Sequence, residues 1–180
     1  MESTESSALA SSASSHEATL NKLHERFGPA ALPVSHFRSD GRVTCPQDRI
    51  GELLAFLRTD CGFDLLVDIT AVDYIEYGGS RDRFAVIYSL TATTTGERLI
   101  VKVFLNEPDL VVPSVVSIWN GANWLEREVF DMFGVRFDGH PDLRRILMPD
   151  EFAAYPLRKD YPLRGRGERH NFPVIGRGES

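Results

Sequence analysis

The sequence predicts an α+β domain, in which a mixed or antiparallel sheet is packed with helices, followed by a long extended C-terminal arm. Three observations predict this class. Two segments place apolar residues at helical spacing, and three later runs are rich in β-branched and aromatic residues. From Gly134 to Ser180, six glycines and five prolines fall within 47 residues, a density at which long regular elements cannot persist.

We expect three regions: a disordered serine-rich tail at 1–16, a folded domain at 17–134 and an extended partner-binding arm at 135–180. With 180 residues and 42% hydrophobic content, the chain can form one domain with a substantial core. Seven of the first 16 residues are serine, and little there could pack. The net charge of −6 argues against general nucleic-acid binding.

Cysteine usage and hydropathy exclude several further classes. Cys45 and Cys61 match no zinc or iron–sulfur spacing, so we expect buried, reduced thiols. No apolar run approaches the roughly 18–20 residues that a membrane span needs, and the N-terminus lacks the basic start and apolar stretch of a signal peptide. At a membrane, the protein is therefore expected to act from the water side.

The first elements are predicted from helical spacing and from turn chemistry. A helix begins near Glu17 and ends at Gly28, and a hairpin at 34–45 is expected to turn at Asp40-Gly41. Pro46 opens a second helix that Gly62 closes. The apolar residues of these two helices are Leu20, Leu23, Phe27, Ile50, Leu53, Leu54 and Leu57.

Three strands and one more helix complete the predicted domain. The strands are Leu65–Tyr74, Phe84–Leu90 and Leu99–Leu105, the last two joined by a TTTGE hairpin loop. Asn123 and Glu126 resemble a capping pair for a helix that ends at Gly134. Asp131 lies near the unfavourable, negative end of that helix, and Arg127 at i−4 is its nearest basic partner. Ser114 is expected to cap a short helical turn before it.

The arm admits several functions. Composition favours a protein-binding arm, because arginine and aromatic residues are enriched in interface cores, but the arm could also wrap its own domain. Single-stranded nucleic-acid binding is disfavoured by the acidic body. A metal site would use Asp131, Asp138, His140 and Asp142, which the extended backbone at Pro141 keeps from converging. Acid–base catalysis would use Asp68 and Asp73, or Glu126 and Glu128.

Specific motifs add a family resemblance. The segment NWLEREVFDMFGVRFDGHPDLRRILMP, the later YPLRKDYP, and the upstream DITAVDY and RFAVIYSL resemble the C subunit of respiratory complex I, the 30-kDa-type subunit of bacterial NADH:quinone oxidoreductase. The resemblance covers about Leu20 to Tyr161. Phe152, Ala153 and Ala154 stand where relatives usually carry tryptophan, an acid and glycine.

The resemblance implies a non-redox accessory subunit in the peripheral arm of a proton-pumping enzyme, with no catalytic, cofactor or metal residues on this chain. The complex uses FMN, Fe–S clusters, NADH and quinone on other subunits. The implied partners are chiefly the homologue of the D subunit, with the B and I subunits nearby, at the cytoplasmic face of the inner membrane. A membrane-bound hydrogenase or a quinone reductase with another donor stays an alternative, and a free-standing metal-dependent hydrolase is a remote one.

Ten arm residues are predicted to bind partner subunits. Five would form charge-paired contacts, because arginine–carboxylate pairs fix the register of an interface. The charged residues are Arg144, Arg145, Arg158, Lys159 and Asp160. The apolar and aromatic residues are Phe137, Met148, Phe152, Tyr155 and Tyr161.

Overall fold

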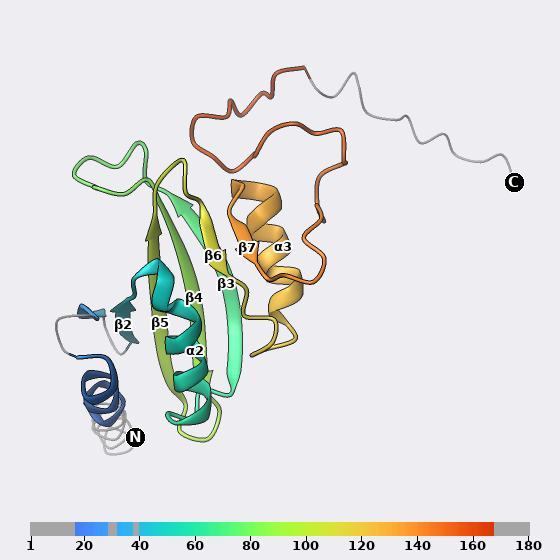
Figure 1. The fold of residues 1–180 in the computed structure, drawn as a ribbon. Coiled ribbons are helices and arrows are strands. Elements are labelled where there is room, and N and C mark those ends of the chain that lie inside the picture. Colours follow the sequence, from blue (N-terminus) through green and yellow to red (C-terminus); the bar gives the residue numbers. More distant parts are fainter. Residues whose placement is uncertain (1–16, 29–31, 38–39, 168–180) are drawn as a thin grey trace, which may run out of the picture.

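A computed structural model describes residues 17–28, 32–37 and 40–167. The predicted tail at 1–16 and the end of the arm at 168–180 lie outside these residues. Among the described residues, five strands form one mixed sheet in the order β1-β2-β5-β4-β3, which confirms the predicted α+β class (Figure 1). The strands are β1 (Val34–Phe37), β2 (Asp40–Thr44), β3 (Leu65–Asp73), β4 (Phe84–Ala92) and β5 (Glu97–Leu105).

Pairing in the sheet is antiparallel except between β2 and β5, which run parallel. The alternation of strand side chains gives the sheet one apolar face. Phe84, Val86 and Tyr88 of β4 are completely buried, and they pack in one core with the inward residues of the helices. Residues 17–27 are helical, and α2 (Ile50–Thr59) follows a short 3-10 helix, η1 (Gln47–Arg49). The predicted apolar stripe of α2 is buried.

The predicted hairpin turn at Asp40-Gly41 is wrong by two residues. In the structure Asp40 pairs with Phe37, and Gly41 pairs with His36, so both lie inside the ladder between β1 and β2. Parallel pairing of Gly41 with Leu99 of β5 fixes this register. A local turn preference cannot detect that long-range constraint.

The last regular elements lie beside the edge strand β3 (Figure 1). β6 (Val111–Pro113) pairs in parallel with β7 (Arg136–Asp138), and α3 (Ala122–Phe133) connects them. Gly134 ends α3 with a φ of 78°, a left-handed conformation that glycine adopts without steric cost. The predicted helix end at Gly134 therefore agrees with the structure.

From residue 139 to 167 the arm contains no helix or strand, as predicted, but it does not leave the domain at Val135. Figure 1 shows that it passes along α3 and returns over the end of the sheet. Backbone contacts confirm this path, because the N–H of Leu157 donates to the carbonyl of Met132 at 3.2 Å. The expectation that the arm departs from the domain is thus wrong for the described part of the arm.

Candidate partner-binding surface

The carboxylate of Asp131 fastens the first part of the arm to the end of α3. Its Oδ2 accepts three consecutive backbone N–H groups, from Ile146, Leu147 and Met148, at 3.0, 2.7 and 2.8 Å. Its Oδ1 accepts a hydrogen bond from Nη1 of Arg145 at 2.6 Å. Burial opposes ionisation, but these donors outweigh it and hold the pKa of Asp131 below its ordinary value. We call this group of contacts the Asp131 clasp.

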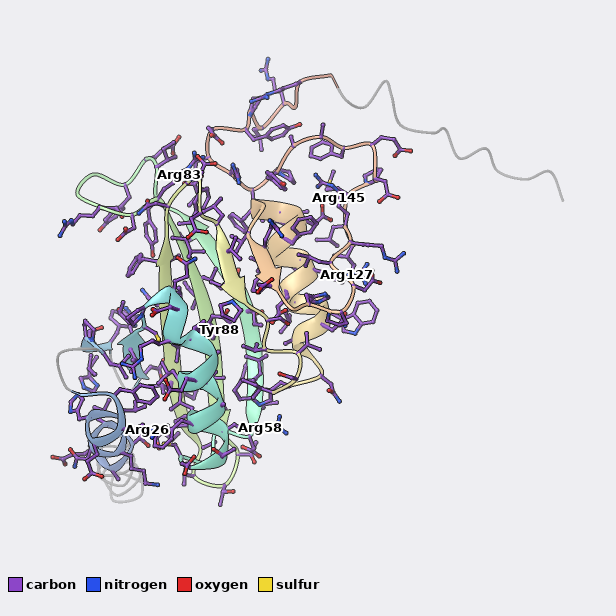
Figure 2. The ribbon with its side chains drawn as sticks, viewed as in Figure 1. Arg26, Arg58, Arg83, Tyr88, Arg127 and Arg145 are labelled. Atoms are coloured by element: carbon purple, nitrogen blue, oxygen red, sulfur yellow. The ribbon has the colours of Figure 1, made fainter. Side chains whose placement is uncertain are left out.

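The prediction that Asp131 pairs with Arg127 is wrong. Arg127 instead donates to the carbonyl oxygens of Arg144 and Arg145, at 3.0 and 3.1 Å. Figure 2 shows both Arg127 and Arg145 on the side of α3 that faces the arm. The two side chains thereby hold the same stretch of the arm. Arg127 binds the backbone of this stretch, and Arg145 binds Asp131.

Arg145 also joins two parts of the arm. Its Nη2 donates to the carbonyl of Ala154 at 3.1 Å. Its guanidinium lies over the rings of Phe152 and Tyr155, at 5.8 and 5.4 Å from their centroids. Because a cation over an aromatic face is attracted by the ring quadrupole, these contacts stabilise the fold of the arm itself.

A second group of charges fastens the later part of the arm to the sheet. Asp73, at the end of β3, accepts the backbone N–H of Lys159 at 2.9 Å and is also bonded by Arg83 at 3.4 Å. Arg83, labelled in Figure 2, also contacts Oδ2 of Asp160 in the arm at 2.7 Å. Burial of Asp73 is again outweighed, and its pKa lies below the ordinary value because of the N–H of Lys159 and the Arg83 guanidinium.

Arg158 completes this second clasp. Its Nη1 contacts Oε1 of Glu107 at 2.7 Å, and its Nε donates to the carbonyl of Phe133 at 2.6 Å. Its guanidinium also lies 4.6 Å from the centre of the Tyr155 ring. The Phe133 carbonyl is one of those left unpaired at a helix end, so Arg158 caps α3 as well as binding the arm.

Glu126 is a buried carboxylate that works within the domain. It accepts the N–H of Val115 and the hydroxyl of Ser114, both at 2.7 Å, and so fixes the connection between β6 and α3. The predicted capping pair of Asn123 and Glu126 is therefore wrong; α3 begins after Gly121 with no side-chain cap. Burial raises the pKa of Glu126 to about 7, because desolvation outweighs its two hydrogen bonds.

Replacing Glu126 with glutamine is expected to remove a pH dependence of stability. An acid with a raised folded pKa contributes stability that is complete below its unfolded pKa and is lost as pH rises through about 7. The loss should amount to about 2–3 kcal/mol between about pH 5 and about pH 8. Glutamine keeps the acceptor for Val115 and has no charge to desolvate.

Urea unfolding of both proteins across this pH range measures the effect. Because every other titrating group is common to both proteins, the difference between the two profiles isolates Glu126. The variant should match the wild type at the acidic end and exceed its stability at the alkaline end. If the unfolding free energies of the two proteins changed in parallel with pH, the raised pKa assigned to Glu126 would be contradicted.

The four residues weighed as metal ligands in the sequence do not come together in the structure. Asp131 is occupied by the arm, and His140 accepts the N–H of Asp142 at Nδ1 while its Nε2 lies 3.1 Å from the carbonyl of Asn123. In the part of the chain that the structure describes, no group of three or more His, Cys, Asp or Glu side chains could hold a metal ion. His140 is a loop residue that fixes the start of the arm.

Two of the ten predicted partner contacts need correction. Phe137 and Phe152 are only 3% and 5% exposed, so their side chains pack inside this chain and are not accessible to a partner. The carboxylates that pair with Arg145 and Arg158, on Asp131 and Glu107, belong to this same chain. Sequence composition cannot separate these cases, because residues that suit an interface core also suit an internal clasp.

The remaining predicted residues lie at or near the surface. The side chain of Arg144 is 73% exposed and pairs with Asp142. Met148, Tyr155 and Tyr161 are half-buried, while Lys159 and Asp160 are exposed.

Sequence reasoning missed a set of apolar side chains that the clasps turn outward. Leu147 is 59% exposed and Leu157 is 50% exposed, although both lie beside clasped backbone. Trp124 of α3 is 60% exposed, and Arg127 lies 5.3 Å from the centre of its ring. The set, which we call the arm surface, comprises Trp124, Ile146, Leu147, Leu157 and Leu163. The one sequence feature that indicates such a surface is that the apolar residues of the arm follow neither helical nor strand periodicity.

The fold and this site define an α+β domain that carries a C-terminal arm clasped onto its last helix. A family model described as respiratory-chain NADH dehydrogenase, 30 Kd subunit, matches residues 43–167, and the chain belongs to this family. The C subunit of the NADH-quinone oxidoreductase of Trichlorobacter lovleyi is 49% identical over 158 residues, which cover 88% of this chain and 94% of that protein. The corresponding C subunit of Geobacter metallireducens is 45% identical and covers 87% and 93%.

Solved structures agree with the family. A trypsin-resistant fragment of Nqo5 superposes with a TM-score of 0.63 at 37% identity, covering 69% of this chain and 98% of the fragment. A chain of the membrane-bound sulfane sulfur reductase, an archaeal respiratory membrane complex, gives a TM-score of 0.71 at 25% identity and covers 92% and 95%. The resemblance to the C subunit of respiratory complex I is confirmed, and with it a function as one subunit of a multi-subunit NADH:quinone oxidoreductase. None of the described helices is long and apolar enough to cross a membrane.

Proposed function

We propose that this chain is a non-redox structural subunit of the peripheral arm of a proton-pumping NADH:quinone oxidoreductase, and that the arm surface binds its neighbours. The observation that carries this proposal is that the clasps hold the arm in place while Leu147 and Leu157 face outward. A surface ordered in advance loses less conformational entropy on binding than a free segment does. Large apolar side chains on such a surface gain free energy when a partner covers them.

The family suggests which neighbours these are. The homologue of the D subunit would be the main partner, with the B and I subunits nearby, on the cytoplasmic face of the membrane. FMN, the Fe–S clusters, NADH and quinone would be bound by other subunits. The exposed charges of Arg144, Lys159 and Asp160 would then face partner charges and help to fix the register of the interface. Within this chain Arg144 already pairs with Asp142, and Asp160 with Arg83.

A second candidate is the same structural function in a complex with another reaction. The similarity to a chain of the sulfane sulfur reductase supports it, because nearly the whole chain matches. Identity of 49% to the C subunit of Trichlorobacter lovleyi, against 25% to that chain, favours the NADH:quinone oxidoreductase. Mass identification of the subunits that co-purify with this chain separates the two.

Placing charges on the arm surface should block assembly. The double variant Leu147→Glu, Leu157→Glu is expected to reduce the yield of assembled complex by about tenfold or more, because each buried carboxylate would lack a partner. The measurement is the amount of companion subunits recovered with the tagged full chain. Val67→Glu is a matched control, since Val67 is 54% exposed and lies on β3, away from the arm. Equal recovery of companions with the double variant and the control would refute the proposed surface.

A further inference from the structure

The face of the sheet opposite the helices is a distinct surface. Along β5, Leu99, Val101 and Val103 are buried in the core, while the alternate residues Ile100 and Lys102 are only half-buried. Residues 17–27, α2 and α3 all contribute to the core cluster on the first face. In residues 17–28, 32–37 and 40–167, no helix packs over the second face, which we call the open face.

Two cations lie next to each other on the open face. Arg42 of β2 pairs with Ile100, and Thr44 pairs with Lys102, so Arg42 and Lys102 are diagonal neighbours on one side of the sheet. The guanidinium of Arg42 lies 4.5 Å from the centre of the Phe37 ring, and its buried Nε has no hydrogen-bond acceptor. Among the described residues, no carboxylate forms an ion pair with either cation.

This arrangement is unfavourable in the isolated chain. Lys102 is half-buried beside a second positive charge, and both burial and repulsion by Arg42 lower the pKa of its ammonium. Asp40, an acidic residue of the same strand as Arg42, pairs with Arg98 at 3.1 Å. A carboxylate supplied from outside would therefore offset repulsion that no ion pair among the described residues offsets.

Several apolar side chains lie beside the two cations. Ile87 of β4 faces Lys102 across the ladder, and both Ile87 and Ile100 are half-buried. Phe104, two residues beyond Lys102, is 36% exposed. An occupant complementary to this face therefore needs a carboxylate set among apolar side chains. A phosphate backbone would not supply the apolar part.

We propose that the open face is a second docking surface, used by a neighbouring protein subunit that places a carboxylate, flanked by apolar side chains, against Arg42 and Lys102. The arm passes along α3, which packs on the helix-covered side of the sheet, so one chain would contact two neighbours at once. The proposal requires a neighbouring subunit, which membership in a multi-subunit complex provides. It does not require the arm surface to be an interface.

The lysines of this chain allow a direct test. The sequence contains three: Lys22, Lys102 and Lys159. The full chain and the purified complex are acylated with an N-hydroxysuccinimide acetate, and each lysine is quantified by mass spectrometry. Assembly should reduce acylation of Lys102 by about tenfold relative to Lys22, which is exposed on the helical residues 17–27. Equal acylation of Lys102 in the complex and the isolated chain would overturn the proposal.

Lys159 reports on the arm independently. Protection of Lys102 without protection of Lys159 would support the open face and contradict the arm surface, and the reverse result would do the opposite. A zero-length carbodiimide then joins the Lys102 amine to its partner carboxylate as an amide, with loss of water. A cross-link to a companion subunit supports the proposal. A cross-link to Glu2 or Glu5, or to a second copy of this chain, overturns it.

Charge reversal separates docking from folding. Lys102→Glu should reduce recovery of the complex by about tenfold, because a like charge would face the partner carboxylate. In the isolated chain the same variant should keep or raise the melting temperature, since it replaces repulsion by Arg42 with attraction. Lys22→Glu is the matched control and should assemble normally. Normal assembly of Lys102→Glu would refute the proposal.

Discussion

Replacing Asp131 with alanine is expected to lower the free energy of unfolding by about 3–5 kcal/mol, the cost of breaking a buried charged pair. The Asp131 side chain is fully buried, and its removal leaves three backbone N–H groups without their acceptor and the Arg145 guanidinium without its carboxylate partner. Each buried donor that loses its acceptor destabilises the folded state, because water cannot reach it to form a replacement hydrogen bond. The part of the arm at 145–148 should then loosen from the end of α3, and the complex should fail to assemble.

Urea unfolding of the full chain measures the stability, and co-purification of companion subunits measures assembly. Asp131→Asn is the matched variant, because it keeps the shape and one acceptor but loses the charge, so an intermediate loss is expected. Asp142→Ala is a control, since Asp142 pairs with Arg144 at the surface, where ion pairs contribute little. If Asp131→Ala were no more destabilising than Asp142→Ala, the clasp would not hold the arm.

The Asp131 clasp also predicts acid sensitivity. A carboxyl with a lowered folded pKa contributes stability above its unfolded pKa, about 3.9, and loses it as pH falls through the folded value. Glu126 acts in the opposite direction: because its pKa is raised, its contribution to stability is largest in acidic conditions. The two effects are separable because they fall in different pH windows.

The second large effect is expected for Gly134→Ala. Gly134 has a φ of 78°, and a Cβ built there would lie 2.6 Å from the ring of Tyr155 and 2.8 Å from Arg158. A side chain at positive φ costs about 1–2 kcal/mol, and forcing a packed neighbour aside adds about 1–3 kcal/mol. The displaced neighbours are parts of the arm, so assembly should suffer as well as stability.

Gly28→Ala provides the matched control for this variant. Gly28 ends the helical residues 17–27 with a φ of 84°, and a Cβ there meets no atom of the described residues within 4 Å, chain neighbours aside. The control therefore reports the cost of backbone strain alone, and the difference in unfolding free energy reports the close approach of the arm. Equal losses for both variants would show that the arm does not pack against Gly134 in solution.

These effects share a physical basis. The arm has no regular backbone hydrogen bonding between 139 and 167, so side chains of the domain must position it. Asp131, Arg127 and Asp73 of the domain provide that positioning at separate points, and Arg158 of the arm binds the carbonyl at the end of α3. Because these charged side chains form their contacts within the chain, the side of the arm that faces away from the domain can carry apolar side chains.

Local patterns predicted the elements of this fold and failed where a distant residue decided the outcome. The periodicity of Leu53, Leu54 and Leu57 predicted α2, since the side chains of one helix face recur every 3.6 residues. Asp131 was recognised as needing a cation, but the sequence offered Arg127 at i−4, while the structure uses Arg145, 14 residues away. Glu126 was likewise assigned to its own helix, although its partners precede the helix.

By itself, the sequence determined the α+β class, the end of the last helix and, through its motifs, the family to which the chain belongs. Only the tertiary structure decided that the arm folds back onto α3, that Phe137 and Phe152 are internal, and that Leu147 and Leu157 face outward. The physical reason is the separation along the sequence between the residues that interact. Helical and strand periodicity is written in adjacent residues, whereas the pairing of a buried carboxylate with a distant loop depends on where the whole chain places them.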